Sequence, residues 1–461
     1  MEHIHFIGIG GTGLSAIATV LLEQGYTVSG SDLFESNLFE AVKMAGGTVA
    51  LGHRAENITG ADLVVRSSAI PENNVEVQAA VEAQIPVLKR SDFLGRMLAE
   101  KEVLAVAGSH GKTTTTSMLV WILSSLSMDP SFIVGGVVSN LGTNAHSGEG
   151  DQFVIEADEY DYMFWGLNPD WSVITNVEHD HPDIFPTSRS FVEAFEGFVK
   201  NLKPGGKLVL CGEDHGALQM KDLVSEDQKV VVYGLSGSGF DYVAETLKTN
   251  LNTGTDFEIR INEEGQETVL PVSLKVPGEH NVLNALAAFI VADGLGLDRQ
   301  EIARVLGEFQ GSERRFDIRG EYHGVMIVDD YGHHPTEITK TLQAARDAYP
   351  TRRIWAVWQP HTYSRTTTLF DRFCGSFGKA DLVLVLDVYA AREEKPEDFH
   401  ILDLVSSIQH NHVQHSAGID QAVELLKTQL QPEDLLIVFT AGDAIEISEQ
   451  IEKYLSAQAG I

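Results

Sequence analysis

Residues 103–116 read Val-Leu-Ala-Val-Ala-Gly-Ser-His-Gly-Lys-Thr-Thr-Thr-Thr, an apolar run followed by a glycine turn and a helix-compatible stretch. Backbone N–H groups in such a turn point at phosphate oxygens, and the start of the helix adds positive partial charge. An exposed Lys112 can reach the outer phosphates, and the Thr113 hydroxyl can hold Mg²⁺. The spacing is Gly-x-x-Gly-Lys-Thr, because Val106 stands where the usual pattern has a glycine. We therefore predict an ATP-binding loop, with an ordinary strand–turn–helix as the alternative.

A second glycine turn, Gly-Ile-Gly-Gly-Thr-Gly at residues 8–13, follows the expected strand His3–Ile7. In a first βαβ unit this pattern binds a pyrophosphate. Asp32 ends the next expected strand, where a carboxylate can accept hydrogen bonds from a ribose or a base. Alone, the pattern is weak evidence, and the alternatives are a tight structural turn and a nicotinamide site. Beside the loop at 108–113 it points to two different nucleotides, one in each of two domains.

The composition is that of a large globular protein. The 461 residues are 43% hydrophobic and 21% charged, and a chain of this length is expected to form roughly two to four domains. The 66 acidic and 33 basic residues give a net charge of −33, which disfavours nucleic acid and anionic membranes as partners. No apolar stretch approaches ~20 residues, no basic leader is present, and Cys211 and Cys374 form no motif. We expect a cytoplasmic protein without membrane insertion or disulfides.

Expected strands and helices alternate almost throughout, which predicts α/β layers with parallel sheets. We predict three domains, at residues 1–97, 98–312 and 313–461. The central one is expected to combine a parallel sheet with a small antiparallel sheet, because two strands flank the turn-rich residues 262–265. Residues 234–239 are expected to form a loop. The expected strands include Leu63–Arg66, Phe153–Ile155, Ser172–Thr175, Lys207–Leu210, Val230–Tyr233, Phe257–Ile261, Val272–Val276, Val325–Val328, Ile354–Trp358, Leu382–Leu386 and Leu435–Phe439.

Polar side chains follow the strands of the central block. Glu156 ends one expected strand, and His181 follows the next, so both are candidates for a Mg²⁺ site near the phosphate loop. The nearby Asp158, Glu159 and Asp161 are expected to be solvated or structural. The His-x-His pattern ending at His181 could instead indicate zinc, but the lack of nearby cysteine argues against a structural zinc site.

Two further groups could complete the site. Asn281 and Asn284 share one helix face, and their amides suit an adenine edge, although isolated asparagines are more often helix caps. In the third block, residues 329–335 and 359–365 each follow an expected strand, so their side chains should meet in one crevice. Arg365 there could bind a carboxylate with two hydrogen bonds, or form a surface salt bridge.

Several segments then appear in a characteristic order: residues 108–114 (Gly-Ser-His-Gly-Lys-Thr-Thr), 156–159 (Glu-Ala-Asp-Glu), 176–181 (Asn-Val-Glu-His-Asp-His), 280–285 (His-Asn-Val-Leu-Asn-Ala), 314–317 (Arg-Arg-Phe-Asp), 329–337 (Asp-Asp-Tyr-Gly-His-His-Pro-Thr-Glu) and 359–366 (Gln-Pro-His-Thr-Tyr-Ser-Arg-Thr). With the N-terminal glycine turn, the sequence resembles the Mur ligase family of peptidoglycan synthesis from end to end. The resemblance implies Rossmann-like N- and C-terminal domains and a P-loop ATPase domain between them.

The resemblance also implies a reaction. ATP would phosphorylate the muramate carboxylate of UDP-N-acetylmuramate, with release of ADP. The amine of L-alanine would attack the acyl phosphate, and a tetrahedral intermediate would collapse to the amide and phosphate. Two Mg²⁺ ions would assist. The bacterial cytoplasm would be the location, and the protein would be a monomer or a weak homodimer.

The family roles map onto this sequence by motif. ATP would contact Gly108, Ser109, His110, Gly111, Lys112, Thr113, Thr114, Asn281, Asn284, Arg315 and Asp330. The UDP-sugar would contact Gly10, Gly11, Thr12, Gly13, Asp32, Ser67 and Ser68. Tyr331, His333 and Arg365 would line the amino-acid site, and Thr113, Glu156 and His181 would bind metal. The catalytic residues would be Lys112, Glu156, His181 and His333, the last as a candidate base.

Two positions depart from the family pattern. Residues 440–443 read Thr-Ala-Gly-Asp where the family often has Gly-Ala-Gly-Asp, and Thr362 stands where some relatives carry arginine beside the amino-acid site. Three alternatives remain open: a ligase that adds a ready-made tripeptide, a nicotinamide-dependent dehydrogenase and a non-catalytic UDP-sugar sensor. Whether Glu159 or His179 joins the metal site is also open.

Overall fold

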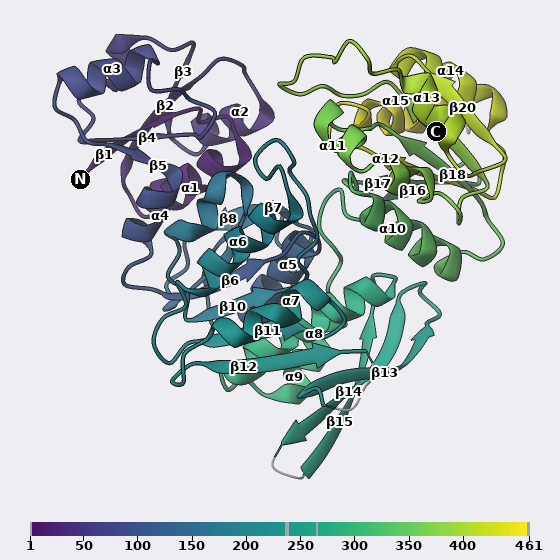
Figure 1. Ribbon diagram of the computed structural model, residues 1–461, viewed down its shortest axis with the longest axis horizontal. Helices are drawn as coiled ribbons and strands as arrows, with labels where there is room; N and C mark the ends of the chain where they lie inside the picture. The colour runs from purple at the N-terminus through teal and green to yellow at the C-terminus, as the bar shows by residue number, and fades with distance from the viewer. Residues whose placement is uncertain (1, 236–238, 264–265, 459–461) are drawn as a thin grey trace.

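The computed structural model describes residues 2–235, 239–263 and 266–458. These residues form three β-sheets with helices packed on them, and Figure 1 shows three corresponding bodies, the N- and C-terminal ones on opposite sides of the view and both next to the central one. The predicted three-domain α/β fold is confirmed. The domain boundaries predicted after residues 97 and 312 fall between the sheets and stay predictions. Residues 236–238 of the expected loop and 264–265 of the expected turn lie outside the described residues.

The first sheet is parallel, in the order β3-β2-β1-β4-β5. Its elements are β1 (His3–Ile7), α1 (Thr12–Glu23), β2 (Thr27–Asp32), α2 (Asn37–Met44), β3 (Thr48–Leu51), β4 (Leu63–Arg66), α3 (Val75–Glu82), β5 (Val87–Lys89) and α4 (Arg90–Met97). The strand order reverses beside β1, so the glycine turn lies at the switch point where such sheets bind ligands. The edge strands β3 and β5 were not predicted, because they are short and lack a clear apolar run.

The second sheet has ten strands in the order β15-β14-β13-β12-β11-β10-β6-β9-β7-β8. Its strands are β6 (Glu102–Ala107), β7 (Ser131–Val138), β8 (Thr143–His146), β9 (Gln152–Glu156), β10 (Trp171–Ile174), β11 (Lys207–Cys211), β12 (Lys229–Gly234), β13 (Tyr242–Thr249), β14 (Thr255–Glu263) and β15 (Gln266–Leu274). The predicted antiparallel strands are present as β13 to β15. Parallel pairing of β12 with β13 joins them to the parallel strands, so one continuous mixed sheet results.

The helices of the central domain are α5 (Lys112–Ser125), α6 (Ser188–Val199), α7 (His215–Gln219), α8 (Glu279–Gly294) and α9 (Arg299–Leu306). Helices α5 and α8 pack against each other, and their apolar side chains share one core with the sheet. Most residues of both helices are buried, which explains why α8 is apolar on nearly every side. This packing fixes the start of α5, where the phosphate loop ends.

The third sheet has the order β16-β17-β21-β18-β19-β20 and is parallel except for β16. Its elements are β16 (Asp317–Tyr322), β17 (Val325–Asp330), α10 (Pro335–Ala348), β18 (Arg353–Trp358), α11 (Tyr363–Thr368), α12 (Phe370–Cys374), β19 (Leu382–Leu386), α13 (Ile401–Ser407), β20 (Val413–Ser416), α14 (Ile419–Gln429), β21 (Asp434–Phe439) and α15 (Ile445–Gln458). The loops that follow β17 and β18 leave the same edge of this sheet, as predicted.

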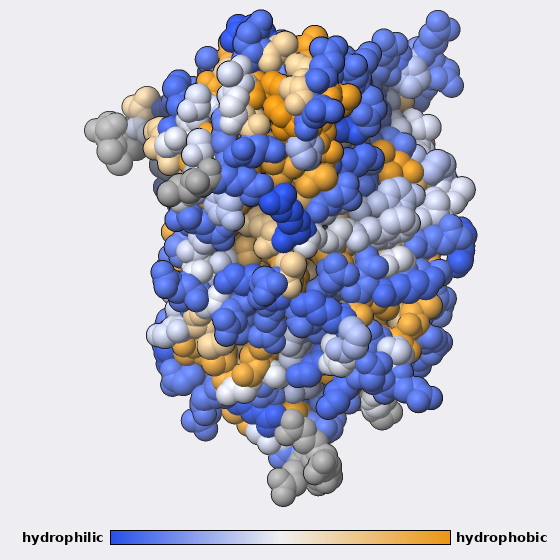
Figure 2. Space-filling model, turned by 90° about the vertical axis from the view of Figure 1, so that its left-hand side faces the viewer, coloured by the Kyte–Doolittle hydropathy of each residue, from blue (hydrophilic) through white to orange (hydrophobic). Residues whose placement is uncertain are grey.

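The surface agrees with the acidic composition. The face shown in Figure 2 is mainly hydrophilic, with apolar patches interrupted by polar side chains. Among the described residues, no helix combines the length and the apolar character that crossing a membrane requires.

A buried carboxylate stabilises the N-terminal domain. Glu76 is fully buried, and burial opposes its charge, but hydrogen bonds from His5, Ser31, Asn57 and the backbone of Arg54 outweigh this and lower its pKa to about 2. The folded-state pKa lies below the value of 4.5 expected without these contacts. The ionised group therefore stabilises the fold above pH 4.5, and this contribution is lost as the pH falls toward 2.

Glu76→Gln is expected to lower stability by roughly 2–3 kcal/mol at neutral pH, because the amide cannot accept the same set of hydrogen bonds. Thermal unfolding measured between pH 7 and pH 3 should also show a weaker acid dependence in the variant. Glu82→Gln, at an exposed position on the same helix α3, is the matched control. Equal acid dependence in Glu76→Gln and the unmodified protein would contradict the assignment.

Candidate nucleotide and amino-acid site

The predicted phosphate loop joins β6 to α5, and its two glycines have conformations that other residues avoid. Gly108 has φ +143° and Gly111 has φ +79°. A Cβ atom on Gly108 would lie 1.9 Å from Thr175 Oγ1, and one on Gly111 would lie 2.5 Å from Asn284 Oδ1. The loop therefore requires glycine at both positions.

The segment after β10 holds this loop from the side. Thr175 Oγ1 donates to His110 O at 2.5 Å, and Asn176 Nδ2 donates to the same oxygen at 3.0 Å. The His110 N–H in turn donates to Asn176 Oδ1 at 2.9 Å. Thr175 was not among the predicted site residues, and Asn176 was recognised only as part of the segment 176–181, because nothing in their spacing connects them to a loop more than sixty residues earlier.

Lys112 is not the exposed loop residue that the sequence analysis assumed. Its Nζ donates to Gly108 O at 2.6 Å and lies 2.8 Å from Glu159 Oε2. Burial opposes the charge of Lys112, but attraction to Glu159 outweighs this and raises its pKa. Glu159 was expected to be either solvated or structural. It is completely buried, so its role is structural. The cation is thus held beside the phosphate loop by a buried partner.

The predicted metal ligands Thr113 and Glu156 lie together. Thr113 Oγ1 donates to Glu156 Oε1 at 3.0 Å, and the Gly135 N–H donates to Glu156 Oε2 at 2.7 Å. A hydroxyl beside a carboxylate is the oxygen donor set that suits Mg²⁺. These two residues therefore fit one metal position next to the phosphate loop.

His181, the third predicted ligand, lies beside Glu159, the partner of Lys112. Its Nε2 is 3.7 Å from Glu159 Oε1 and 3.8 Å from Asp180 Oδ2. Burial lowers its pKa to about 4, and the nearby Arg365 acts in the same direction. The ring is therefore neutral at physiological pH, which is the form that can bind a metal.

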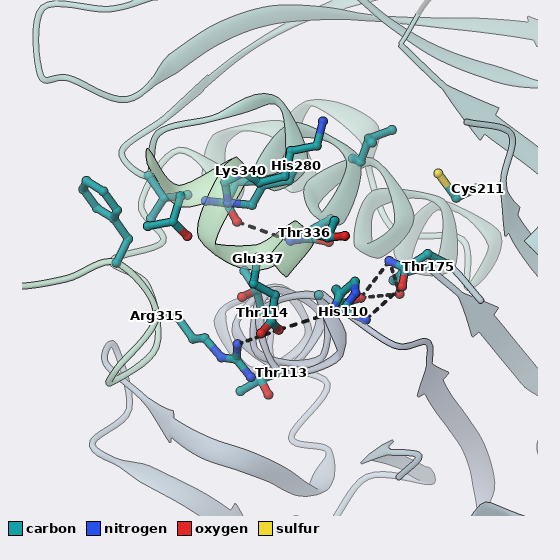
Figure 3. A pocket seen from close by; sticks show the side chains of 18 of the residues that line it. His110, Thr113, Thr114, Thr175, Cys211, His280, Arg315, Thr336, Glu337 and Lys340 are labelled. Atoms are coloured by element: carbon teal, nitrogen blue, oxygen red, sulfur yellow. Dashed lines mark hydrogen bonds and ion pairs between the residues drawn. The ribbon is translucent and has the colours of Figure 1, made fainter. Parts of the chain in front are cut away.

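A cavity of about 260 Å³ adjoins the phosphate loop and extends to the C-terminal domain (Figure 3). The predicted ATP residues that line it are His110, Gly111, Thr113, Thr114, Asn281, Asn284, Arg315 and Asp330. Side chains far apart in the sequence thus face one nucleotide-sized space. Gly108, Ser109 and Lys112 belong to the loop beside it.

Two asparagines in the wall of this cavity are hydrogen-bonded to each other. Asn281 Nδ2 donates to Pro277 O at 2.8 Å, and Asn284 Nδ2 donates to Asn281 Oδ1 at 3.3 Å. Asp330 also lines the cavity; its Oδ1 accepts the Gly332 N–H at 2.7 Å, and burial raises the pKa of Asp330 to about 6. Amide and carboxylate groups are therefore already positioned at the wall of the cavity.

Several further residues line the cavity and were not predicted, among them Cys211, Tyr233, His280, Thr336, Glu337 and Lys340. The last three lie in helix α10. Thr336 and Glu337 belong to the recognised segment 329–337 without having been given a role, and Lys340 follows on the same face, so a helix-face argument could have placed all three at the site. Cys211 and Tyr233 come from the ends of β11 and β12, which only the sheet order brings to the cavity.

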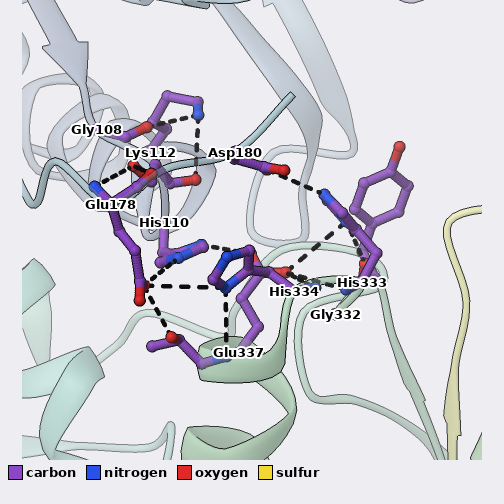
Figure 4. A network of polar contacts seen from close by, with 12 residues as sticks. Gly108, His110, Lys112, Glu178, Asp180, Gly332, His333, His334 and Glu337 are labelled. Carbon is purple, nitrogen blue, oxygen red and sulfur yellow. Dashed lines mark hydrogen bonds and ion pairs between the residues drawn. The ribbon is translucent and has the colours of Figure 1, made fainter. Parts of the chain in front are cut away.

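An ion-pair cluster joins the phosphate loop to the C-terminal domain (Figure 4). His110 Nε2 is 2.9 Å from Glu178 Oε2, and His110 Nδ1 is 3.3 Å from Glu337 Oε1. Burial disfavours the charged ring, but these two carboxylates outweigh it and raise the pKa of His110 to about 9. Thr336 Oγ1 donates to Glu178 Oε2 at 2.8 Å, and Arg372 also pairs with Glu178.

The same cluster contains three side chains whose spacing could hold a metal ion, namely His110, Glu178 and His334. Three of its four ring nitrogens already have partners in the protein. His110 Nε2 and Nδ1 face the carboxylates of Glu178 and Glu337, and His334 Nδ1 accepts the Thr336 N–H at the start of α10. We interpret this cluster as a contact between domains.

The predicted amino-acid residues meet the central domain at its loop after β10. Arg365 Nε donates to Asp180 Oδ1 at 2.7 Å, and both side chains are about 3% exposed, so this is a buried ion pair and no surface salt bridge. His333 Nε2 lies 3.7 Å from Asp180 Oδ2. The Tyr331 ring packs under the Arg315 guanidinium, 5.1 Å from it. The loop after β10 therefore closes the crevice that was expected between residues 329–335 and 359–365.

The N-terminal glycine turn is braced internally. The Gly10 N–H donates to Asp32 Oδ2 at 2.9 Å, and Ser36 Oγ donates to Gly10 O at 2.9 Å. A Cβ on Gly8 would lie 3.0 Å from the side chain of Ser67, so the segment of predicted residues 67–68 adjoins the turn. Asp32 thus supports the turn, whatever further hydrogen bonds it makes.

One cation near this turn was missed. Arg90 packs against Gly13, where a Cβ would lie 2.0 Å from Arg90 Nη1, and Arg90 Nη2 is 3.2 Å from Asp158 Oδ2 of the central domain. An isolated arginine carries no sequence signal, and only the fold places it at the start of α1.

Comparison with known proteins agrees with this geometry. Family models described as "Mur ligase family, catalytic domain", "Mur ligase middle domain" and "Mur ligase, glutamate ligase domain" match residues 3–102, 106–292 and 314–442. The UDP-N-acetylmuramate–L-alanine ligase of Desulforamulus reducens is 42% identical over 98% of both chains, and that of Roseiflexus sp. is 39% identical over 99% of this chain and all of the relative.

Two solved structures are also similar. The UDP-N-acetylmuramate–alanine ligase of Thermotoga maritima has a TM-score of 0.82 at 28% identity, with both chains fully covered. The murein peptide ligase of Psychrobacter arcticus has a TM-score of 0.73 at 25% identity over 99% of both chains. The matching models and the full-length relatives lead to one conclusion: this chain belongs to the Mur ligase family.

Proposed function

We propose that this protein is an ATP-dependent ligase that joins L-alanine to the muramate carboxylate of UDP-N-acetylmuramate. The observation that carries the proposal is a cavity lined by Thr113 and by residues of the C-terminal domain, with Glu156 hydrogen-bonded to Thr113 and with Lys112, held by Glu159, directly before Thr113 in the loop. Full-length relatives named UDP-N-acetylmuramate–L-alanine ligase, at about 40% identity, support the choice of substrates. A dehydrogenase would leave this arrangement without a purpose.

In this proposal ATP occupies the 260 Å³ cavity. Asn281 and Asn284 face the adenine, Asp330 the ribose, and Arg315 and Lys112 the phosphates, with backbone N–H groups of residues 108–114 around them. The glycine turn at residues 10–13, with Asp32, Ser67 and Ser68, holds the UDP part of the second substrate.

Thr113 and Glu156 would hold one Mg²⁺, and His181 would bind a second ion. When bound, Mg²⁺ supplies positive charge against the phosphate oxygens. The protein itself contributes a positive charge held in a fixed position. Lys112 stays charged through its pair with Glu159 and can meet the negative charge that builds up on the transferred group.

The reaction proceeds in two steps. The γ-phosphoryl group moves to a carboxylate oxygen of muramate and ADP leaves, which turns that oxygen into part of a leaving group. The amine then forms the C–N bond to the acyl carbon and gives a tetrahedral intermediate, which collapses to the amide as the C–O bond to phosphate breaks. The alanine ammonium nitrogen loses two protons in all; His333 takes one, and the other leaves with the phosphate. The three domains would exclude water from the acyl phosphate.

A direct test is phosphate release from ATP with Mg²⁺ and UDP-N-acetylmuramate, measured with L-alanine, with the tripeptide L-Ala-γ-D-Glu-diaminopimelate, and without an acceptor. We expect release that depends on L-alanine. Release only with the tripeptide would assign the protein to the recycling reaction, and release with neither would favour the UDP-sugar sensor.

A further inference from the structure

The loop after β10 carries one buried carboxylate to which the proposed reaction gives no role. Asp180 is 2% exposed and belongs to the central domain. Its Oδ1 accepts a hydrogen bond from Arg365 Nε at 2.7 Å, and its Oδ2 lies 3.7 Å from His333 Nε2. Figure 4 shows Asp180 and His333 pointing toward each other across the domain boundary. A single carboxylate therefore faces two of the side chains predicted to hold the amino acid.

Asp180 Oδ2 and His333 Nε2 lie close enough together for one donor group to reach both. At 3.7 Å the two atoms are too far apart for a good direct hydrogen bond. His333 Nδ1 lies 3.1 Å from Tyr331 O, which makes Nδ1 the donor and leaves the lone pair on Nε2. A nitrogen that donates to both atoms at about 2.9 Å would lie beside the line that joins them, at the apex of a triangle.

The charges around this position select an ammonium group. The carboxylate of Asp180 and the Nε2 lone pair are both acceptors, and an alkylammonium group offers three donors and a positive charge. Arg365 lies beside them and can receive the matching anion. Its Nη1 and Nη2 face His361 Nδ1 at 3.0 Å and His181 Nδ1 at 3.4 Å. Neither imidazole neutralises the guanidinium, so it retains attraction for a second carboxylate.

We propose that Asp180 binds the α-ammonium group of the incoming amino acid together with His333 Nε2, while Arg365 binds the α-carboxylate. This inference rests on the proposed ligase function and adds a recognition residue to it. The ammonium group would be held by the central domain and the carboxylate by the C-terminal domain. The amino acid would therefore bridge the two domains. Its ammonium group would lie near Asp180 Oδ2, the oxygen that His181 Nε2 also approaches, at 3.8 Å.

The test is Asp180→Asn, which keeps the shape of the side chain and removes its charge. We expect the KM for L-alanine to rise roughly 10- to 100-fold, the effect of losing a charge-assisted hydrogen bond. The KM values for ATP and UDP-N-acetylmuramate should stay within about twofold. Hydroxylamine, uncharged at pH 8 and without a carboxylate, can replace the amino acid, and the hydroxamate formed with it should change less than about threefold.

Asp183→Asn is the matched control. Asp183 lies on the same loop and pairs across the same domain boundary, with Arg392 Nη2 at 3.1 Å, so its loss weakens the domain contact without touching the proposed ammonium site. Because Asp180→Asn leaves Arg365 without its partner, a second variant, Asp180→Glu, keeps the charge and displaces it by one methylene. It should also raise the KM for L-alanine, and thermal unfolding will show whether each variant is folded.

The outcomes separate the two proposals. An unchanged KM for L-alanine in folded Asp180→Asn and Asp180→Glu, or an equal loss with hydroxylamine, would overturn the ammonium site and leave the ligase function intact. A rise in KM as large in Asp183→Asn would also overturn it. Failure of the unmodified protein to join L-alanine would instead refute the ligase function itself, and the inference with it.

Discussion

Lys112→Met is expected to lower the rate of ATP-dependent product formation by roughly 10²- to 10³-fold, because the loop loses the lysine cation that, in the proposed function, meets the outer phosphates together with Arg315. The structure adds a second effect. Glu159 is fully buried and 2.8 Å from Lys112 Nζ, so the variant leaves a buried carboxylate without its partner. We expect a loss of about 3 kcal/mol in stability. Steady-state rates and thermal unfolding measure the two effects separately.

A double variant tells the two roles of Lys112 apart. Lys112→Met with Glu159→Gln removes both charges, and it should recover most of the stability while remaining inactive. Recovery of activity in the double variant would mean that Lys112 serves only to neutralise Glu159. A single variant that forms product at nearly the normal rate would exclude the phosphate role altogether.

Glu156→Gln is expected to reduce the rate by a similar factor, roughly 10²- to 10³-fold at ordinary Mg²⁺ concentrations. The amide can keep both neighbours, since its oxygen can accept the Gly135 N–H and its NH₂ can donate to Thr113 Oγ1. The fold should therefore survive while the anionic metal ligand is lost. Rates measured across a range of Mg²⁺ concentrations should show that the variant needs more of the ion.

Glu102→Gln is a suitable control for this variant. Glu102 begins β6, beside β9, and accepts a hydrogen bond from Gln152 at the opposite end of the sheet. Its replacement should leave the Mg²⁺ dependence unchanged. If Glu156→Gln and Glu102→Gln behave alike, Glu156 does not bind metal during the reaction.

Much of the fold could be predicted because a strand with a continuous apolar run can be recognised from the sequence alone. Val103–Ala107 is buried and central, and the strand appears as β6. Short or polar strands such as β3, β8 and β20 lack that pattern and were missed. Pairing across the sheet stabilises them, and that information is not local.

The candidate site divides in the same way. Glycines, Lys112 and Thr113 occur at fixed short spacings, so their neighbourhood could be recognised from the chain alone. Glu159 looked like one acidic residue among several, and its burial against Lys112 became visible only in three dimensions. The same holds for Asp180, whose partners are more than 150 residues further along the chain.

By itself, the sequence determined the three α/β units, the two glycine turns and the residues that follow each apolar strand, because these features depend on local periodicity and on the conformational freedom of glycine. Only the tertiary structure decided which of those residues meet. Sheet order, the packing of α5 on α8 and the approach of the C-terminal domain bring Lys112 to Glu159 and Arg365 to Asp180. The physical reason is that burial and electrostatic pairing depend on distances in space, which local sequence patterns do not encode.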